Sequence, residues 1–223
     1  MKFLQYGLSK ANTEEVPAGD GSQVAMPIQL VLPKNNEEGG FLSGTSGVEV
    51  ENNKIYFYCP VSDEKVLALN KILHKVDKEL QILAVNLGLE TTFPIELHIN
   101  SPGGDLLSGF AAYDHIRRCK NPVHTYVDGQ AASAASLMSV AGKKRFITEN
   151  SFILIHQLSS GLYGTHENFR DTFSNQNKMM EKILNIYKKH TNIDEKKLKS
   201  ILKRDLYLPS EKCLEYGLVD KIF

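Results

Sequence analysis

Two serine hydroxyls lie in a segment of very small side chains, DGQAASAAS at 128–136. The segment follows the β-branched run VHTYV at 123–127, which predicts a turn from a strand into a helix. Ser133 falls at that turn, where its hydroxyl can point out of a sheet and the N–H of Ala134 stays free. Ser136 falls one turn into the helix, a position typical of close packing. Ser133 is therefore the candidate nucleophile, although small residues at such a turn also serve close packing alone.

A second predicted strand end carries glycines. SPGGD at 101–105 follows the strand-like run IELHI at 95–99 and precedes an amphipathic helix. Gly103 and Gly104 allow positive φ and let a substrate carbonyl approach the backbone. Helix starts offer unpaired N–H groups at a positive dipole end, and acyl transfer needs such donors for a developing oxyanion. An ordinary turn explains SPGG equally well, so this motif alone leaves both interpretations open.

A serine nucleophile needs a base, and His156 is the candidate. It ends the predicted strand FILIHQ at 152–157, so we expect it at the same carboxyl edge of the sheet as the two loops. On its own, a histidine at such a position is more often structural. The other histidines have no comparable setting in the sequence: His74, His98, His115, His124, His166 and His190.

The base needs an orienting acid, and the sequence offers three candidates. Asp205 lies in LKRDLYLPS, after a Lys-rich segment and before a Pro-Ser turn. Asp194 and Asp220 are rival carboxylates. For each of the three, a helix cap or a solvated charge is the alternative interpretation.

The elements that must position these residues alternate between strands and helices. β-Branched and aromatic runs predict the strands, and apolar residues at helical spacing predict the helices. The predicted strands are 54–59, 95–99, 123–127, 145–148, 152–157 and 217–223. The predicted helices are 62–80, 106–118, 133–142 and 169–187, followed by a Lys-rich helix. This order predicts an α/β fold with mostly parallel strands and right-handed crossovers.

Composition limits the classes of function. The 223 residues fit one domain with an extension, large enough to bury a core without disulfide or metal staples. Lys+Arg and Asp+Glu number 26 each, so no broad basic field points to nucleic acid or an anionic membrane. The three cysteines, Cys59, Cys119 and Cys213, show no C-x-x-C spacing. We therefore expect a reducing compartment and no metal site.

The N-terminal part differs in texture from the rest. Residues 1–48 are rich in Gly, Ser, Asn and Glu, with one short apolar run at 28–32, and we expect a partly flexible arm before a domain at 49–223. The N-terminus lacks the continuous apolar stretch of a signal peptide, and no apolar run of 18 residues occurs. These features predict a cytoplasmic protein that binds neither membrane nor nucleic acid.

Four motifs in order carry a resemblance to a known family. INSPGG (99–104), GQAAS (129–133), IHQ (155–157) and RDLYLPSEKCLEYGLVD (204–220) resemble the proteolytic subunit of the Clp protease, the ClpP family. Each motif is weak alone, but four in the same order with compatible spacing are strong. The resemblance covers residues from about Ile55 to Phe223.

The resemblance implies roles for the residues that match those motifs. It assigns the nucleophile to Ser133, the base to His156 and the orienting acid to Asp205. It assigns the oxyanion donors to the backbone N–H groups of Gly104 and Ala134.

The resemblance also implies a fold and a substrate-binding segment. The fold would be the ClpP/crotonase type, a spiral of βαβ units with a projecting strand–helix handle at about 159–190. Substrate would lie along Gly103, Gln157, Leu158 and Ser159.

The activity implied by the resemblance is that of a serine endopeptidase. It would cleave peptides and unfolded proteins through an acyl-enzyme, inside a homo-oligomer of two stacked seven-membered rings. It would need no cofactor, with ATP used only by a partner unfoldase, a hexameric Clp ATPase. Alternatives are a ClpP-fold protease of another role (phage maturation or signal-peptide type), a crotonase-like acyl-CoA enzyme, and an inactive structural ring subunit.

The sequence departs from the family pattern in three places. Leu158 follows the His-Gln pair where the family has proline, so the substrate-lining strand is expected to sit differently. Lys203 replaces the acid before the Arg-Asp pair, in a region that contacts the opposite ring in the family. The arm at 1–48 lacks the family's usual N-terminal pattern, so we expect the chemistry to be kept and the docking of a partner to be altered.

Overall fold

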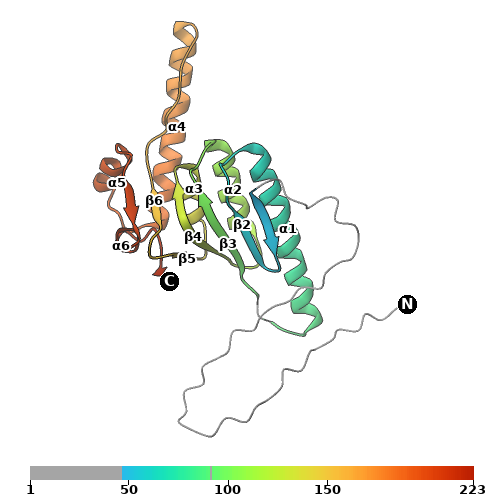
Figure 1. The fold of residues 1–223 in the computed structure, drawn as a ribbon. Coiled ribbons are helices and arrows are strands. Elements are labelled where there is room, and N and C mark those ends of the chain that lie inside the picture. Colours follow the sequence, from blue (N-terminus) through green and yellow to red (C-terminus); the bar gives the residue numbers. More distant parts are fainter. Residues whose placement is uncertain (1–46, 91) are drawn as a thin grey trace.

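The computed structural model describes residues 47–90 and 92–223, which form one eight-stranded sheet with helices packed against it (Figure 1). The strands are β1 Val48–Glu51, β2 Lys54–Phe57, β3 Ile95–Ser101, β4 Val123–Ala132, β5 Lys144–Ile147, β6 Phe152–Leu154, β7 Tyr207–Pro209 and β8 Lys221–Ile222. The helices are α1 Asp63–Asn86, α2 Leu106–Arg118, α3 Ala134–Val140, α4 His166–His190, α5 Glu195–Leu202 and α6 Ser210–Glu215. The predicted α/β class is confirmed.

The central strand is β4, which pairs with three neighbours. The order across the sheet is β1-β2-β3-β4-β5-β8, and β6 leaves this path by pairing with β4 and β7. β5 pairs with β4 at 124–127, and β6 pairs with it at 130–132. Every pair is parallel except β1–β2 and β6–β7, as the alternation of elements predicts. The carboxyl ends of β3, β4 and β6 therefore meet at one edge of the sheet.

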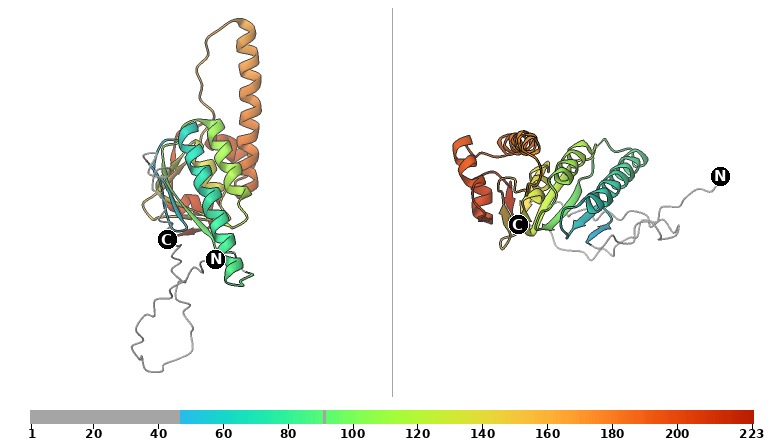
Figure 2. Two further views of the ribbon diagram at one scale, coloured as in Figure 1. Left: turned by 90° about the vertical axis from the view of Figure 1, so that its right-hand side faces the viewer. Right: turned by 90° about the horizontal axis from the view of Figure 1, so that it is seen from above.

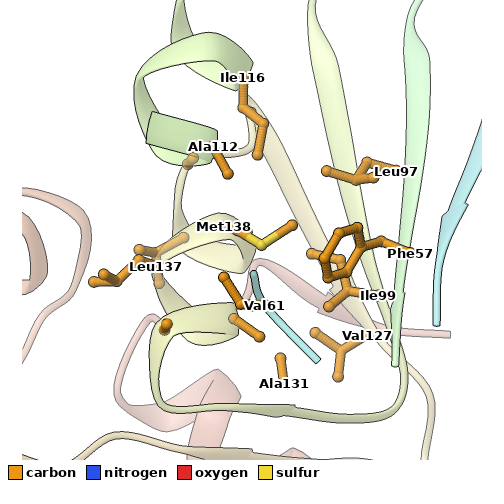
Figure 3. Packing of buried hydrophobic residues seen from close by; sticks show 14 of the residues in the cluster. Phe57, Val61, Leu97, Ile99, Ala112, Ile116, Val127, Ala131, Leu137 and Met138 are labelled. Carbon is orange, nitrogen blue, oxygen red and sulfur yellow. The ribbon is translucent and has the colours of Figure 1, made fainter. Parts of the chain in front are cut away.

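The core lies between the sheet and the helices α1, α2 and α3, which cover one of its faces (Figure 2). Figure 3 shows Phe57, Leu97, Ile99 and Val127 from the strands opposite Met138 from α3, and all five are fully buried. Alternate strand residues point to this face because side chains in a strand have a period of two. Every residue of α3 is buried, so this short helix is fixed in place by packing.

The opposite face of the sheet carries a row of aromatic rings. Tyr56, His98, Tyr126 and Phe146 are cross-strand neighbours on β2, β3, β4 and β5. Their rings stack with centroid separations of 5.0, 4.7 and 4.7 Å along the row. Phe223 packs edge-on against Tyr126 at 5.3 Å. Such stacked pairs stabilise a sheet beyond the area that they bury.

Carboxylates surround the histidine in this row. His98 Nδ1 lies 2.6 Å from Asp128 Oδ2, and Nε2 lies 3.8 Å from Glu96 Oε2. Burial disfavours the charged ring, but the hydrogen bond with Asp128 and the negative charges of both carboxylates outweigh it and raise the pKa of His98 to about 9. The Tyr58 hydroxyl donates to Asp128 at 2.9 Å, and burial together with this carboxylate raises the pKa of Tyr58 to about 12. At neutral pH, His98 is therefore an imidazolium.

Several strand bounds differ from the predicted ones. β4 runs to Ala132 rather than ending at Val127, because β6 pairs with its last three residues. β6 ends at Leu154, so His156 lies two residues beyond the strand rather than at its end. The terminal strand is shorter than predicted and comprises only β8. β1 and β7 are not predicted from the sequence, because strands of three or four residues, one of them closed by Pro209, carry little periodic signal.

The handle, residues 159–190, consists of helix α4 and the chain that leads into it. α4 projects away from the sheet (Figure 1), and Thr165 caps its start by accepting the N–H of Asn168. The expected strand part is wrong for this chain, because the described residues 155–165 form no strand. A strand needs a neighbouring strand to complete its hydrogen bonds, and none pairs with this segment here.

Most of the predicted arm at 1–48 lies outside the described residues, including the apolar run at 28–32. β1 begins at Val48, one residue before the domain predicted at 49–223.

The ion pairs of His98 predict how stability depends on pH. The raised pKa means that the native state binds this proton more tightly than the unfolded state does. Its stabilisation is complete below the unfolded pKa of about 6.5 and is lost as pH rises through about 9. Urea unfolding of the wild type and of His98→Gln should therefore show a larger difference in unfolding free energy at pH 6 than at pH 10. An equal difference at both values of pH would contradict this account.

Candidate functional site

Ser133 lies between the last residue of β4 and the first residue of α3, at the predicted strand-to-helix turn. Its backbone has φ 54° and ψ −124°, and Asn52 is the only other non-glycine with positive φ in the described ranges. Its N–H donates to the carbonyl oxygen of Leu154 at 2.8 Å, and its own carbonyl accepts the N–H of Ser136 at 3.0 Å. These contacts hold the Ser133 side chain at the carboxyl edge of the sheet.

The small residues around Ser133 fit both interpretations, close packing and access to the Ser133 hydroxyl. A Cβ atom added to Gly109 on α2 would lie 3.0 Å from the Cβ of Ala134, so α2 and α3 are in close contact. A Cβ atom added to Gly103 would lie 2.4 Å from the carbonyl oxygen of Ala132 and 2.7 Å from the Cβ of Ser133. Small residues here serve close packing and also keep the approach to the Ser133 hydroxyl open.

A chain of hydrogen bonds joins three of the predicted site residues. Ser133 Oγ lies 2.7 Å from His156 Nε2, and His156 Nδ1 lies 2.9 Å from Asp205 Oδ1. With the proton on Nδ1 directed to the carboxylate, Nε2 is free to accept the serine proton. This is the arrangement that activates a serine hydroxyl for attack on a carbonyl carbon.

The rival carboxylates are engaged elsewhere. Asp194 caps α5, accepting the N–H of Lys197 at 3.0 Å. Asp220 lies 2.5 Å from Arg145, and although burial favours the neutral acid, this guanidinium lowers the pKa of Asp220. Asp205 is the only one of the three predicted candidates that touches His156. Its side chain is 80% exposed in the single chain.

Two backbone N–H groups face this site without an acceptor. The Gly104 and Ala134 N–H groups have no hydrogen-bond partner within the described part of the chain. Gly103 and Gly104 have φ of +87° and +150°, so the SPGG turn uses conformations that L-residues avoid. A Cβ atom on Gly104 would lie 2.2 Å from the Val61 carbonyl oxygen, so the loop also packs closely. Unpaired donors beside a nucleophile are what an oxyanion requires.

A pocket of about 480 Å³ opens beside the serine. Gly104, Ser133, Ala134 and His156 line it, as do the predicted substrate-binding residues Gln157, Leu158 and Ser159. Gly103, also predicted to bind substrate, lies behind the turn and does not line the pocket. A pocket of this size accommodates a few side chains of an extended peptide or a small ligand.

Helix α4 supplies a wall of the pocket that the sequence analysis did not predict. The α4 residues that line it are Thr172, Asn175, Gln176, Met179, Ile183 and Tyr187. Apart from the adjacent pair Asn175 and Gln176, they follow one another in steps of three and four residues, which places them on one helical face. This spacing and the polar Thr, Asn and Gln side chains are visible in the sequence and could have indicated a binding face. The element that this face packs against is set by long-range contacts, which the sequence pattern does not give.

Leu158 stands where the family has proline, and unlike a proline it has a backbone N–H that donates a hydrogen bond. That N–H donates to the sulfur of Met180 on α4 at 3.1 Å. The neighbouring Gln157 N–H donates to the Leu202 carbonyl at the end of α5, at 2.7 Å. The segment that follows His156 is therefore anchored on both sides.

The chain belongs to the Clp protease family, because the family model described as Clp protease matches residues 55–223. A relative from Treponema denticola, named ATP-dependent Clp protease proteolytic subunit 2, is 40% identical over 157 residues, covering 69% of this chain and 77% of the relative. A relative from Deinococcus radiodurans, named ATP-dependent Clp protease proteolytic subunit, is 37% identical over 130 residues. That match covers 57% of this chain and 64% of the relative. The family resemblance inferred from four motifs is confirmed.

Two further properties concern cofactors and membranes. Within residues 47–90 and 92–223, no three His, Cys, Asp or Glu side chains form a group that could hold a metal ion. The helices in these same ranges are all too short or too polar to span a bilayer. The three cysteines are free thiols, and burial raises the pKa of Cys59 to about 11.

The contacts of Gly103 predict the effect of adding one methyl group. Gly103→Ala places a Cβ atom against backbone and against Ser133 at a positive φ, so it should lower the unfolding free energy by more than about 1 kcal/mol in urea titrations. Gly161→Ala is the matched control, because its Cβ would meet nothing within 4 Å and its φ is not positive. Equal urea midpoints for the two variants would show that the turn is less constrained than described.

Proposed function

We propose that this protein is a serine endopeptidase that hydrolyses peptide bonds through an acyl-enzyme on Ser133. The observation that carries the proposal is the hydrogen-bonded series Ser133–His156–Asp205 beside the unpaired N–H groups of Gly104 and Ala134. Membership of the Clp protease family supports the same activity.

Each group has a defined part in the proposed reaction. His156 Nε2 removes the proton as Ser133 Oγ bonds to the peptide carbonyl carbon, and the carbonyl electron pair moves onto its oxygen. The N–H groups of Gly104 and Ala134 stabilise that oxyanion, while Asp205 stabilises the imidazolium. His156 then returns the proton to the leaving amine as the C–N bond breaks. Water, deprotonated by His156, hydrolyses the ester and restores Ser133.

The alternative functions fit the site less well. A crotonase-like acyl-CoA enzyme needs an oxyanion site but has no use for a serine aligned with a histidine and an aspartate. An inactive structural subunit is expected to lack one of these three residues, and all three are in contact here. A ClpP-fold protease of another role, of the phage-maturation or signal-peptide type, uses the same chemistry and differs in its substrates.

We propose that substrates are short peptides and unfolded segments that bind in extended form along Gln157, Leu158 and Ser159. These residues line the pocket next to Ser133. The reaction needs no cofactor in this chain. ATP would be used by a hexameric Clp ATPase that unfolds substrates, a proposal supported by the words "ATP-dependent" in the names of both relatives.

We propose that the chain works as a homo-oligomer, two stacked rings of seven. The support within this chain is the apolar surface of the handle, which no other part of residues 47–90 and 92–223 covers. Its large exposed side chains are Leu162, Tyr163, Phe169 and Phe173. An apolar surface of this kind on a projecting element is typical of a subunit interface.

The nucleophile can be tested by active-site labelling. Ser133→Ala should abolish both peptide hydrolysis and labelling by a fluorophosphonate, because among the described residues the Ser133 hydroxyl alone is hydrogen-bonded to His156. Ser139→Ala is the matched control, since this buried hydroxyl on α3 has no partner within the described residues. Mass-spectrometric mapping should place the label on Ser133. Labelling that survives in Ser133→Ala would overturn the proposed function.

The orienting acid can be identified by amide substitution. Asp205→Asn should lower kcat by up to about 10⁴ with little change in KM, because an amide favours the wrong tautomer and does not stabilise the imidazolium. Asp194→Asn and Asp220→Asn should keep near-normal kcat, since these carboxylates bind a helix N-terminus and Arg145. If either control shows the large loss instead, Asp205 does not orient His156.

The assembly can be tested by native mass spectrometry of the full chain. The expected mass is fourteen times the 25.0 kDa of one chain. Phe173→Asp places a charge in the exposed apolar surface of the handle and should shift the mass to smaller species. Val85→Asp, at an exposed position in the last turn of α1, should keep the full mass. A wild-type protein that stays monomeric would refute the ring assembly.

A further inference from the structure

A second series of hydrogen bonds reaches Ser133 from the side away from His156. The Ser136 hydroxyl donates to the Ser133 carbonyl oxygen at 2.5 Å, and the Tyr187 hydroxyl lies 2.6 Å from the same Ser136 oxygen. Ser136 is fully buried, and Tyr187, on α4, is 2% exposed. The sequence pattern assigned Ser136 to close packing, but its hydroxyl is engaged on both sides.

The chemistry of the two hydroxyls fixes the direction of this series. A serine hydroxyl has one proton, and a carbonyl oxygen can only accept. Ser136 therefore gives its proton to the Ser133 carbonyl and accepts a proton from Tyr187. Burial raises the pKa of Tyr187, so the phenol keeps the proton that it donates.

The carbonyl that receives these bonds belongs to the same peptide group as the Ala134 N–H. A trans peptide is planar, and its C=O and N–H point in opposite directions. The Ser133 carbonyl is held by the Ser136 hydroxyl and by the Ser136 N–H at 3.0 Å. Two bonds on the carbonyl therefore set the direction in which the Ala134 N–H points.

The peptide group between Ser133 and Ala134 would not keep this orientation without the hydrogen bonds to its carbonyl oxygen. Ser133 has a positive φ, which costs a residue with a side chain on the order of 1–3 kcal/mol. Rotation of the Ser133–Ala134 peptide plane would leave φ of Ser133 unchanged, but it would bring ψ from −124° toward the better populated left-handed α region and turn the Ala134 N–H away from the site. The hydrogen bonds from Ser136 oppose this rotation.

Helix α4 also contacts the segment that follows His156. Met180 on α4 accepts the N–H of Leu158, two residues after His156. Tyr187 and Met180 lie two turns apart on α4, so one helix contacts both the turn that carries the nucleophile and the segment that carries the base.

We infer that Tyr187 and Ser136 are positioning residues that aim the Ala134 N–H at the oxyanion of the reaction. This inference rests on the proposed peptidase function and adds residues to its machinery. Neither side chain touches the reacting atoms. They act through the Ser133 carbonyl, and through them the placement of α4 controls the strength of the oxyanion site.

The first test removes one hydroxyl from the assembled full-length protein. Tyr187→Phe should lower kcat for a fluorogenic peptide on the order of 10- to 100-fold, with KM changed less than about twofold. The affinity of a peptide boronate, whose tetrahedral adduct mimics the oxyanion, should fall by a similar factor. The affinity of an unreactive product peptide should not change. A purely structural role would lower the melting temperature and leave boronate affinity of the folded protein unchanged, which would overturn the inference.

The second test is a double-mutant cycle with Ser136→Ala. Because both hydroxyls act in one series, the double variant should be no slower than the slower single variant. Ser136→Ala leaves the buried Tyr187 hydroxyl without an acceptor, so adding Tyr187→Phe should regain stability. A double variant that is more stable than Ser136→Ala but no more active supports the inference. Losses in kcat that multiply, or activity that returns with stability, would contradict it. Ser136→Ala also serves alone if Tyr187→Phe fails to fold.

Two control variants remove hydroxyls that are not in the series. Ser139→Ala removes an unpartnered hydroxyl from the same helix α3. Tyr113→Phe removes a phenol hydroxyl that lies 2.7 Å from His190 Nε2, three residues along α4 from Tyr187. Both should keep normal kcat and normal boronate affinity. Hydrolysis that survives Ser133→Ala would refute the peptidase itself, whereas normal boronate affinity in Tyr187→Phe refutes only this inference.

Discussion

The backbone of Ser133 is held at φ 54° and ψ −124°, and the rest of the site depends on that constraint. A conformation of this kind costs on the order of 1–3 kcal/mol and persists only where several contacts enforce it. The Leu154 carbonyl from β6 and Ser136 from α3 enforce it by hydrogen bonds. Gly103 leaves no free volume behind the turn. The turn therefore forms only when the sheet, α3 and the SPGG loop are all in place.

Sheet order brings distant parts of the chain to this turn. The site residues Ser133 and His156 are 23 positions apart, and His156 and Asp205 are 49 apart. They meet because β6 pairs with the last three residues of β4, and β7 pairs with β6. The extension of β4 beyond β5 creates the place for β6. The same extension carries the chain into α3, so one feature of the sheet positions both Ser133 and His156.

The fold class and the meeting of Ser133 and His156 at one sheet edge could be predicted, because strand ends and glycine turns are local features of the sequence. The choice among three carboxylates could not be made from the residues alone, since a cap such as Asp194 and an orienting acid look alike until their partners are known. The hydrogen bonds of the Ser136 hydroxyl could not be predicted from the sequence either. Its partner Tyr187 is 51 positions away, and no local pattern predicts which helix face meets α3. The short strands β1 and β7 were missed because VEVE alternates over only four residues and YLP is too short to show a period.

The exposure of Asp205 has a consequence for how fast the enzyme can turn over. At 80% exposure, its carboxylate is surrounded mainly by water, and solvation competes with the contact to His156. In the proposed reaction, the rate would scale with the fraction of time that Asp205 and the imidazole are aligned. Leu206 and Tyr207 beside it are exposed as well, at 58% and 53%. A surface that covers these two side chains would keep Asp205 hydrogen-bonded to His156 for longer. The fraction of molecules with the aligned carboxylate would then rise without any contact to the substrate.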